Sequence, residues 1–293
     1  MNWWKGLKGK VRLSVPLKAH TTFKIGGPAE FFITPQDTRD LKFLLNLLKR
    51  YKIPFLVIGA GSNILVGDKG VKSAVLRLNS ACFKKIEFKN NRIEVGSGVL
   101  LNQVLMFAKE HGLSGMEFLV GIPGTLGGAL IMNAGVQVKS LSDLVENVTV
   151  MDYNGKIKTL NKRDIKFEYR KSNLAKYIIL SVCLRLARKD RQEIKDSIKK
   201  YISYRKLTQD LGWPSAGCIF KNPPGYSAGQ LIDLCGLKGQ RLGDARISLK
   251  HANFIVNLKN AKAREVAKLM GLIVNKVKDK FNITLKPEIK VWR

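Results

Sequence analysis

Two glycine-rich segments are the parts of the sequence best suited to bind a cofactor. Gly59-Ala60-Gly61-Ser62-Asn63 directly follows an apolar run, and the segment 121–135 has four glycines among its first eight residues. Such glycines destabilise regular elements, but they let backbone N–H groups approach a phosphate or a flat ring closely. Either loop alone is equally explained as a tightly turned linker. Two of them in one region favour a large phosphorylated cofactor.

The first loop does not match the dinucleotide-binding pattern of a Rossmann fold. Ile64 stands where the third glycine of G-x-G-x-x-G belongs, and no helical pattern follows it. The sequence therefore excludes a Rossmann domain at this loop, but the backbone of the loop can still bind a diphosphate.

The basic composition raises nucleic-acid binding as an alternative function. The 293 residues include 52 Lys and Arg against 22 Asp and Glu, a formal charge of +30. A nucleic-acid-binding protein would show salt-sensitive retention on nucleic acid and no bound chromophore. The charge is spread along the whole chain instead of forming one block. We therefore interpret it as a generally basic surface that favours anionic ligands, and we expect no nucleic-acid partner.

Other reactive side chains indicate neither a metal site nor a disulfide framework. The four cysteines form no C-x-x-C pair, and only three histidines accompany them. The N-terminus lacks the apolar core of a signal peptide, and the uncharged stretch 118–138 is interrupted by a proline and five glycines. We expect a reduced, soluble, cytoplasmic protein without metal and without membrane insertion.

The apolar periodicity predicts an α+β chain. A helix with Leu41, Leu44, Leu45 and Leu48 on one face is expected between the run 31–33 and a buried strand at 55–58. Short β-branched runs alternate with turns from about 75 to 187, with a hairpin at Asn154-Gly155 and one helix at 101–111.

A boundary is expected near residue 189. Asp190 and Glu193 have the spacing of a capping box and are followed by an apolar stripe from Ile194 to Ile202. A second long helix carries a stripe from Ala263 to Val277. The chain thus divides into a region of about 190 residues and a smaller one of about 100, both α+β.

An ordered series of motifs resembles the UDP-N-acetylenolpyruvoylglucosamine reductase family. The motifs are TTFKIGGPA (21–29), GAGSNILV (59–66), GIPGTLGGALIMNAG (121–135), YRKS (169–172), PSAGCIFKNP (214–223), AGQLI (228–232), HANFIVN (251–257) and PE (287–288). The resemblance implies NADPH-dependent reduction of UDP-N-acetylglucosamine enolpyruvate to UDP-N-acetylmuramate, for peptidoglycan synthesis. A hydride passes to the enolpyruvyl methylene carbon, and the α-carbon is then protonated.

The resemblance also implies the fold and the cofactor. An FAD-binding domain of the vanillyl-alcohol-oxidase (PCMH) type, built from two α+β subdomains, is expected over 20–188. A smaller α+β domain for the UDP-sugar is expected over 190–293, with its last residues returning to the active site. FAD is expected to be non-covalent, because the first glycine loop has no histidine. The implied FAD-binding residues are Gly59, Ala60, Gly61, Ser62, Asn63, Ile64, Gly121, Pro123, Gly124, Thr125, Gly127, Gly128, Asn133 and Gly135.

Three residues match the family's catalytic positions. Arg170 would hold the substrate carboxylate or enolate, because a guanidinium stays charged and offers two donors. Glu288 would be at least partly protonated beside the enolate. Cys218 stands where most members have the proton-donating serine, and an ordinary thiol is only about 3% ionised at pH 7, so it has a proton to give. By residue type alone, a surface residue is the better interpretation of Arg170 and of Glu288, and a small buried apolar cysteine is the better interpretation of Cys218.

The remaining positions include several departures from the family pattern. Lys221, Asn222 and Arg205 match substrate contacts, and 48 positions between Arg170 and Cys218 suit the shorter form of the family, which lacks a tyrosine-bearing loop. Asp210 replaces a proline after Gln209, and Gln137 replaces a tyrosine expected near the substrate. His251 is interpreted as a structural histidine.

Two enzyme alternatives remain beside the reductase. One is an FAD-linked oxidoreductase acting on another alcohol or sugar, although the PSAGC and KPE motifs disfavour it. The other is a cysteine hydrolase using Cys218, His251 and Asn253. For the reductase, the expected partner is a small-molecule UDP-sugar, and a monomer is favoured.

Overall fold

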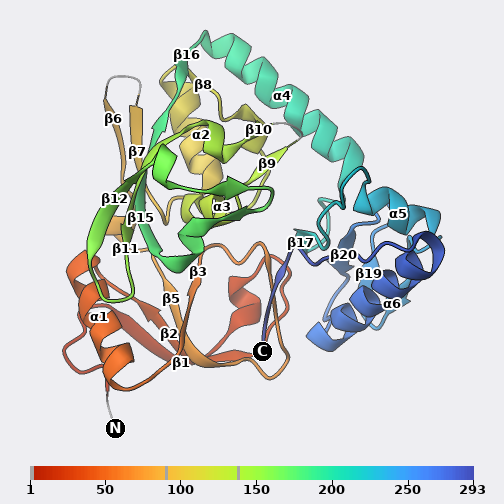
Figure 1. Ribbon diagram of the computed structural model, residues 1–293, viewed down its shortest axis with the longest axis horizontal. Coiled ribbons are helices and arrows are strands. Elements are labelled where there is room, and N and C mark those ends of the chain that lie inside the picture. Colours follow the sequence, from red (N-terminus) through yellow and green to blue (C-terminus); the bar gives the residue numbers. More distant parts are fainter. Residues whose placement is uncertain (1–2, 90–91, 137–138) are drawn as a thin grey trace. The chain divides into compact units, whose positions relative to one another are not determined.

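The computed structural model describes residues 3–89, 92–136 and 139–293 (Figure 1). The chain forms two compact units, each assembled from separate stretches of sequence. The first unit contains 1–13, 31–60 and 73–203, and the second contains 14–30, 61–72 and 204–293. Residues 20–188 are expected to bind FAD and residues 190–293 the UDP-sugar. These expectations concern ligands and stay predictions.

The first unit contains the β-α-β arrangement expected from the sequence. It consists of β2 (Pro28–Thr34), α1 (Thr38–Arg50) and β3 (Phe55–Ile58). Asp37 caps α1 by accepting the N–H of Asp40, and the leucine stripe of the helix is buried. The expectation of a buried strand at 55–58 is wrong, since Ile58 alone is buried and Val57 is 42% exposed. The reason is its position at the edge of a four-stranded sheet with the order β1-β2-β5-β3.

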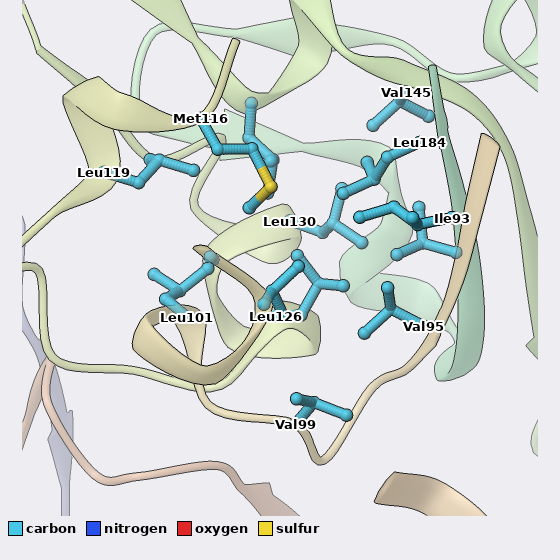
Figure 2. Close-up of a cluster of buried hydrophobic side chains, with 14 of the residues drawn as sticks. Ile93, Val95, Val99, Leu101, Met116, Leu119, Leu126, Leu130, Val145 and Leu184 are labelled. Atoms are coloured by element: carbon cyan, nitrogen blue, oxygen red, sulfur yellow. The ribbon is translucent and has the colours of Figure 1, made fainter. Parts of the chain in front are cut away.

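A five-stranded antiparallel sheet forms the centre of the first unit. Its order is β12-β11-β15-β7-β6, and Gly155 (φ +82°) forms the predicted turn between β11 and β12. Helices α2 (Leu101–Glu110) and α3 (Leu126–Ile131) pack on this sheet, and only α2 is expected from the sequence. Figure 2 shows Leu126 and Leu130 of α3 among side chains of β7, β11 and β15. This burial fixes the second glycine loop, because α3 is its continuation.

The remaining elements before residue 189 are short. The strands of the two sheets above are β1 (Lys10–Pro16), β5 (Val71–Arg77), β6 (Ile86–Lys89), β7 (Arg92–Gly96), β11 (Val145–Met151), β12 (Ile157–Asn161) and β15 (Ile178–Arg185). Two-residue strands are β8 (Leu113–Ser114), β9 (Gly135–Val136), β10 (Lys139–Ser140), β13 (Phe167–Glu168), β14 (Lys171–Ser172) and β16 (Ala187–Arg188). Short 3-10 turns are Leu17–His20, Ala81–Lys84, Glu117–Leu119, Leu141–Asp143, Lys162–Asp164 and Asn173–Lys176.

Helix α4 (Arg191–Thr208) is the helix expected after residue 189. The Asp190 carboxylate accepts the N–H groups of Gln192 and Glu193, as a helix cap does. However, Ile194 and Ile198 pack in the apolar cluster of the first unit, and the last stretch of the second unit begins at Tyr204. The apolar stripe therefore ties most of α4 to the preceding residues.

The second unit has a core built from both ends of the chain. Its sheet has the order β17-β20-β19-β18 and is covered by α5 and α6. The apolar stripe of α6 is buried, as the sequence predicts. Phe23, Ile25 and Leu65 belong to the same cluster. The elements are β4 (Ile64–Val66), β17 (Ser215–Cys218), α5 (Ala228–Leu234), β18 (Arg241–Leu242), β19 (Ala245–Ile247), β20 (Phe254–Asn257), α6 (Ala263–Phe281) and β21 (Lys290–Trp292). No helix in the described ranges is long and apolar enough to span a membrane.

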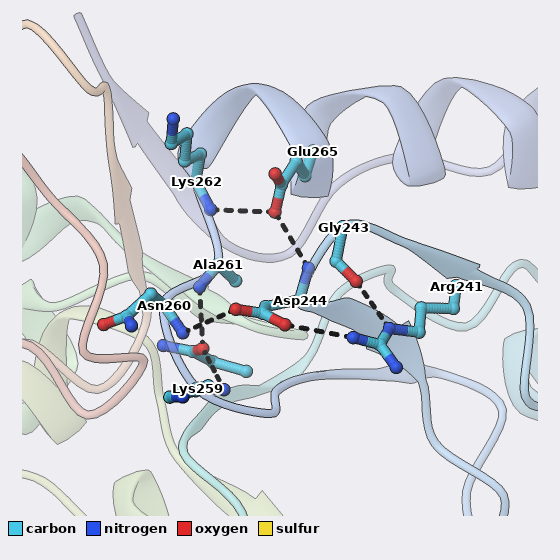
Figure 3. Close-up of polar contacts among 9 residues, drawn as sticks. Arg241, Gly243, Asp244, Lys259, Asn260, Ala261, Lys262 and Glu265 are labelled. Atoms are coloured by element: carbon cyan, nitrogen blue, oxygen red, sulfur yellow. Dashed lines mark hydrogen bonds and ion pairs between the residues drawn. The ribbon is translucent and has the colours of Figure 1, made fainter.

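Carboxylates satisfy the N-terminus of α6. The Asp68 carboxylate accepts the N–H of Ala263 at 2.7 Å and that of Arg264 at 3.2 Å. Glu265 accepts the N–H of Lys262 at 3.0 Å and, as Figure 3 shows, also that of Asp244. These N–H groups have no partner within a helix, and negative charge near them is favourable. Asp68 thus joins the segment after β4 to the longest helix of the unit.

We expect Asp68→Ala to lower the free energy of unfolding by about 1–2 kcal/mol, because two helix N–H groups lose a charged acceptor. Thermal unfolding followed by circular dichroism measures the change. The control is Asp279→Ala, an exposed position near the other end of α6, where a negative charge opposes the helix dipole. Equal stability of the two variants would contradict the capping role of Asp68.

Candidate active site

The start of the first glycine loop, Gly59, meets the second loop in the first unit. A Cβ atom at Gly59 would lie 2.4 Å from Oγ1 of Thr125, so only glycine fits there. Thr125 is the N-cap of α3, and its Oγ1 accepts the N–H of Gly128 at 3.3 Å. Gly121 (φ +73°) and Gly124 (φ +159°) have backbone conformations that other residues rarely adopt. The glycines thus permit a tight approach of one loop to the other.

The loops differ in which backbone groups they offer a ligand. The first loop is tied to the chain through carbonyl oxygens, since Thr22 donates to Gly61 and Lys290 donates to Asn63. In the same two peptide units, the N–H groups of Ser62 and Ile64 point away from these carbonyls and suit a diphosphate. In the second loop, the N–H groups of residues 126, 127 and 128 donate to Val99, Ser97 and Thr125. That loop can therefore contribute close approach, but not those three donors.

Gly128 is a glycine that the protein's own packing does not require. It is exposed, its backbone is helical, and a Cβ there would come no closer than 3.5 Å to Thr125 Oγ1. At Gly127, by contrast, a Cβ would lie 2.9 Å from the Cβ of Ser97. Alanine is favoured over glycine in helices by about 1 kcal/mol. A ligand lying close to the backbone of α3 explains the missing side chain, so these residues fit a flat, phosphorylated cofactor.

Arg170 lies in the turn of a small hairpin, and this hairpin contacts the end of the second glycine loop. Strands β13 and β14 pair with a two-residue turn, and Arg170 has φ +54°. Its Nη1 donates to the carbonyl of Gly135 at 3.0 Å, and its guanidinium lies 5.4 Å from the centre of the Tyr169 ring. A non-glycine residue at positive φ costs on the order of 1 kcal/mol or more and persists only where the surroundings hold it.

Two side chains hold the hairpin in place. The hydroxyl of the buried Ser172 donates to the carbonyls of Leu130 and Ile131, at the end of α3. The amide of Asn133 donates to the carbonyl of Glu168 and accepts the N–H of Ser142. Asn133, predicted to bind the cofactor, thus also joins the glycine loop to the hairpin of Arg170. Gln137 lies outside the described residues.

A β-bulge precedes Cys218 in the second unit. Ser215 pairs with Val256 and Cys218 with Phe254, so β17 has one residue more than β20 between these pairs. Gly217 within the bulge has φ +75°, and nothing lies within 4 Å of the place of its Cβ. Bulges turn a strand and redirect the side chain that follows. The backbone therefore determines where the partly buried Cys218 points.

Glu288 lies between the Cys218 segment and the first glycine loop. Its N–H donates to the carbonyl of Ile219 at 2.8 Å, and its carbonyl accepts the side-chain amide of Asn63 at 3.3 Å. Lys221 donates its N–H to Lys286, while Asn222 accepts the N–H of Ala228 at the start of α5. The second unit thus brings Cys218, Lys221, Asn222 and Glu288 close together in the fold, and Arg170 belongs to the first unit.

Comparison with known proteins extends over nearly the whole chain. Residues 208–292 match the family model for the UDP-N-acetylenolpyruvoylglucosamine reductase C-terminal domain, and residues 29–161 match an FAD binding domain. The reductase of Caldanaerobacter subterraneus subsp. tengcongensis is 42% identical over 97% of this chain and 94% of its own length. That of Moorella thermoacetica is 40% identical over 98% of this chain and 95% of its own length.

A solved structure agrees with this. The crystal structure of UDP-N-acetylenolpyruvylglucosamine reductase from Thermus caldophilus superposes with a TM-score of 0.83 at 39% identity, covering 98% of this chain and 99% of that one. The chain belongs to the UDP-N-acetylenolpyruvoylglucosamine reductase family. The predicted resemblance, the α+β fold with an FAD-binding domain and a smaller C-terminal domain, and the cofactor FAD are confirmed. The chain is an FAD-dependent oxidoreductase.

The contacts of His251 and Asn253 disfavour the hydrolase alternative. Nδ1 of His251 accepts the N–H of Asn253 at 3.2 Å, and burial lowers the pKa of this imidazole below its usual range. The side chain of Asn253 binds both backbone groups of Phe220, at 2.9 and 2.8 Å. The amide therefore supports the segment after Cys218 instead of orienting the imidazole. Sequence reasoning missed this role, because a buried asparagine has no distinctive spacing.

Thr22 and Asn63 also have roles that their motifs did not reveal. Oγ1 of Thr22 donates to the carbonyl of Ser215 at 2.7 Å and so fixes the start of β17. The side-chain amide of Asn63 donates to the carbonyl of Glu288, and its predicted contact with the cofactor stays a prediction. No disulfide joins any of the four cysteines, and no three potential metal ligands cluster among the residues described.

We expect Gly128→Ala to weaken FAD binding while leaving the apoprotein as stable as before or slightly more stable. The methyl group fits the protein but occupies the space of a ligand approaching α3. Flavin absorbance per protein and titration of the apoprotein with FAD measure binding. The control is Gly271→Ala in α6, which has nothing within 4 Å of its Cβ position. Unchanged FAD affinity in Gly128→Ala would contradict a ligand at this surface.

Proposed function

We propose that this chain reduces UDP-N-acetylglucosamine enolpyruvate to UDP-N-acetylmuramate with NADPH, as a step in peptidoglycan precursor synthesis. The observation that carries the proposal is the match of about 40% identity along almost the entire length of reductases with this name. Bound FAD would supply the hydride chemistry, from NADPH to the methylene carbon of the enolpyruvyl group. The protein must bind both substrates, stabilise negative charge and donate a proton.

The glycine loops would hold the cofactor. The N–H groups of Ser62 and Ile64 suit its diphosphate, and the exposed backbone of α3 at Gly128 suits a closely packed part of it. The binding set comprises Gly59, Ala60, Gly61, Ser62, Asn63, Ile64, Gly121, Pro123, Gly124, Thr125, Gly127, Gly128, Asn133 and Gly135. FAD would be bound non-covalently within 20–188, and 190–293 would bind the UDP-sugar, with Glu288 returning to the reaction centre.

Arg170 would bind the carboxylate of the enolpyruvyl group. Hydride addition at the methylene carbon places an electron pair on the α-carbon, and this charge spreads onto the adjacent carboxylate as an enolate. A guanidinium with paired donors stabilises that charge, and a preorganised donor costs no rearrangement during the reaction. The strained φ of Arg170, held by the hairpin contacts, is consistent with such preorganisation.

Cys218 would protonate the α-carbon. The S–H bond breaks, the proton joins the carbon that holds the enolate electron pair, and the thiolate is later reprotonated from solvent. The bulge at Gly217 positions this side chain through the backbone. Glu288 in its protonated form would donate a hydrogen bond to the developing charge, since an ionised carboxylate would repel it.

The UDP-sugar would be bound mainly by the second unit. Lys221 and Asn222 follow Cys218 directly and would contact the sugar, while Arg205 would reach the diphosphate. Lys221 and Asn222 lie on the segment after Cys218, which hydrogen bonds to Asn253 and Lys286 hold in place. The generally basic surface suits an anionic substrate. We further propose that the enzyme works in the cytoplasm as a monomer.

The test is the visible spectrum of the FAD-loaded protein without oxygen. We expect NADPH to bleach the flavin absorbance and UDP-N-acetylglucosamine enolpyruvate to restore it. Bleaching without restoration would overturn the proposed substrate and favour another FAD-linked oxidoreductase. Failure to bind added FAD would contradict the whole proposal.

The two half-reactions separate the role of Cys218. We expect Cys218→Ser to retain sugar reduction, because a hydroxyl also carries a proton, and Cys218→Ala to lose it by about 10²-fold or more. Both variants should be bleached by NADPH at the rate of the wild type. Rapid-mixing spectroscopy measures each step. If Cys218→Ala were reoxidised by the sugar as fast as wild type, Cys218 would not be the proton donor.

A further inference from the structure

The last turn of α4 and Asp210, two residues after the helix, are both tied to the turn 248–251 of the second unit. Oγ of Ser248 donates to the Asp210 carboxylate at 3.0 Å, and Nζ of Lys250 donates to the carbonyl of Lys206. The second contact places a positive charge at the C-terminal end of the helix, where it is favourable. Two side chains from one turn therefore hold the end of α4 at neighbouring points.

Arg205 is located within this tied segment. Its side chain is only 8% exposed, and Nη1 donates to Oε1 of Gln209 at 3.1 Å. The N–H of Gln209 donates back to the carbonyl of Arg205 at 2.8 Å. Two hydrogen bonds thus join Arg205 to Gln209, and Asp210 is the residue that follows Gln209 in the chain. The hydrogen bond from Ser248 to Asp210 therefore lies next to this pair in the chain.

Ser248 is a rigid anchor. It is fully buried, and its Oγ accepts the N–H groups of Lys250 and His251 while donating to Asp210. The turn continues through Nδ1 of His251 to the N–H of Asn253. Asn253 in turn binds Phe220, two residues after Cys218. A continuous series of hydrogen bonds therefore runs from Asp210 to the segment that carries Cys218 and Lys221.

We propose that Asp210 is a positioning residue for the UDP-sugar: its hydrogen bond with Ser248 holds the end of α4 so that Arg205 is in place for the diphosphate. This inference rests on the proposed function, in which Arg205 binds that group. The same hydrogen bonds keep the diphosphate-binding side chain in register with the segment of the proton donor. Asp210 itself need not touch the substrate.

The charge of Asp210 makes the proposal testable. A carboxylate near a diphosphate site would repel the ligand, so a role through charge predicts tighter binding when the charge is removed. A role through the hydrogen bond predicts weaker binding when the acceptor is removed. Asp210→Ala removes both the acceptor and the charge, whereas Asp210→Asn removes only the charge and keeps an oxygen for Ser248.

The experiment measures UDP binding to the FAD-loaded protein by calorimetry, together with kcat and KM for the UDP-sugar. We expect Asp210→Ala to raise the Kd of UDP and the KM about tenfold, the scale of one lost hydrogen bond to a charged group. The kcat and the bleaching by NADPH should change by less than about twofold, since the reacting groups are untouched. Asp210→Asn should restore wild-type Kd, and Asp279→Ala, exposed on α6, is the matched control.

Amide hydrogen exchange gives a readout that does not need a substrate. We expect faster exchange in both 204–210 and 248–251 for Asp210→Ala and normal exchange for Asp210→Asn. Equal weakening of UDP binding in both variants, tighter binding in both, or unchanged binding in Asp210→Ala would each overturn the proposal. If the wild type neither binds UDP nor reduces the sugar, the proposed function fails, and this inference with it. If the wild type does both and Asp210→Ala matches it, this inference alone fails.

Discussion

The candidate site in the second unit depends on the main-chain hydrogen bonds of residues 286–290. This short segment joins two others that are distant in sequence, because Lys286 and Glu288 bond to residues 219–221 and Lys290 bonds to Asn63. Parallel pairing of β21 with β4 then extends the contact to Trp292. This segment therefore supports both Cys218 and the first glycine loop, as Thr22 also does through its bonds to Gly61 and Ser215. The end of the chain is therefore part of the site, and Glu288 is placed by its own backbone.

Backbone conformation, more than side-chain packing, determines the positions of the proposed catalytic residues. Arg170 lies at positive φ in a two-residue turn, and Cys218 follows a bulge containing a glycine at positive φ. At Arg170 this conformation stores strain of about 1 kcal/mol or more and persists because surrounding bonds fix it, whereas a glycine such as Gly217 adopts positive φ readily. For Arg170 those bonds come from Ser172 and Asn133, which belong to motifs flanking the reactive position. This explains why the informative sequence motifs extend beyond the residues proposed to do chemistry.

Much of the fold could be predicted from local patterns, and much of the site could not. The leucine stripe of α1, the hairpin at Gly155 and the stripe of α6 follow periodicities that the sequence displays directly. The exposure of Val57 and the packing of Ile194 depend on which elements lie beside them, and no local pattern contains that information. Likewise, the bonds of Asp68 to α6 and of Thr22 to Ser215 join residues almost two hundred positions apart. The proposed roles of Arg170, Cys218 and Glu288 came from motif resemblance and remain predictions.

The geometry also explains how this chain can differ from its family at reactive positions. Where the backbone sets the direction of a side chain, as the bulge does for Cys218, the atom proposed to donate the proton can change from oxygen to sulfur without moving the Cβ atom. At position 210 the motif resemblance implies a proline, whose ring would restrict the backbone by itself. Asp210 provides no such restriction, but its bond to the buried Ser248 fixes the same point through a side chain. Both departures therefore change the chemical group while a second feature of the chain maintains the position.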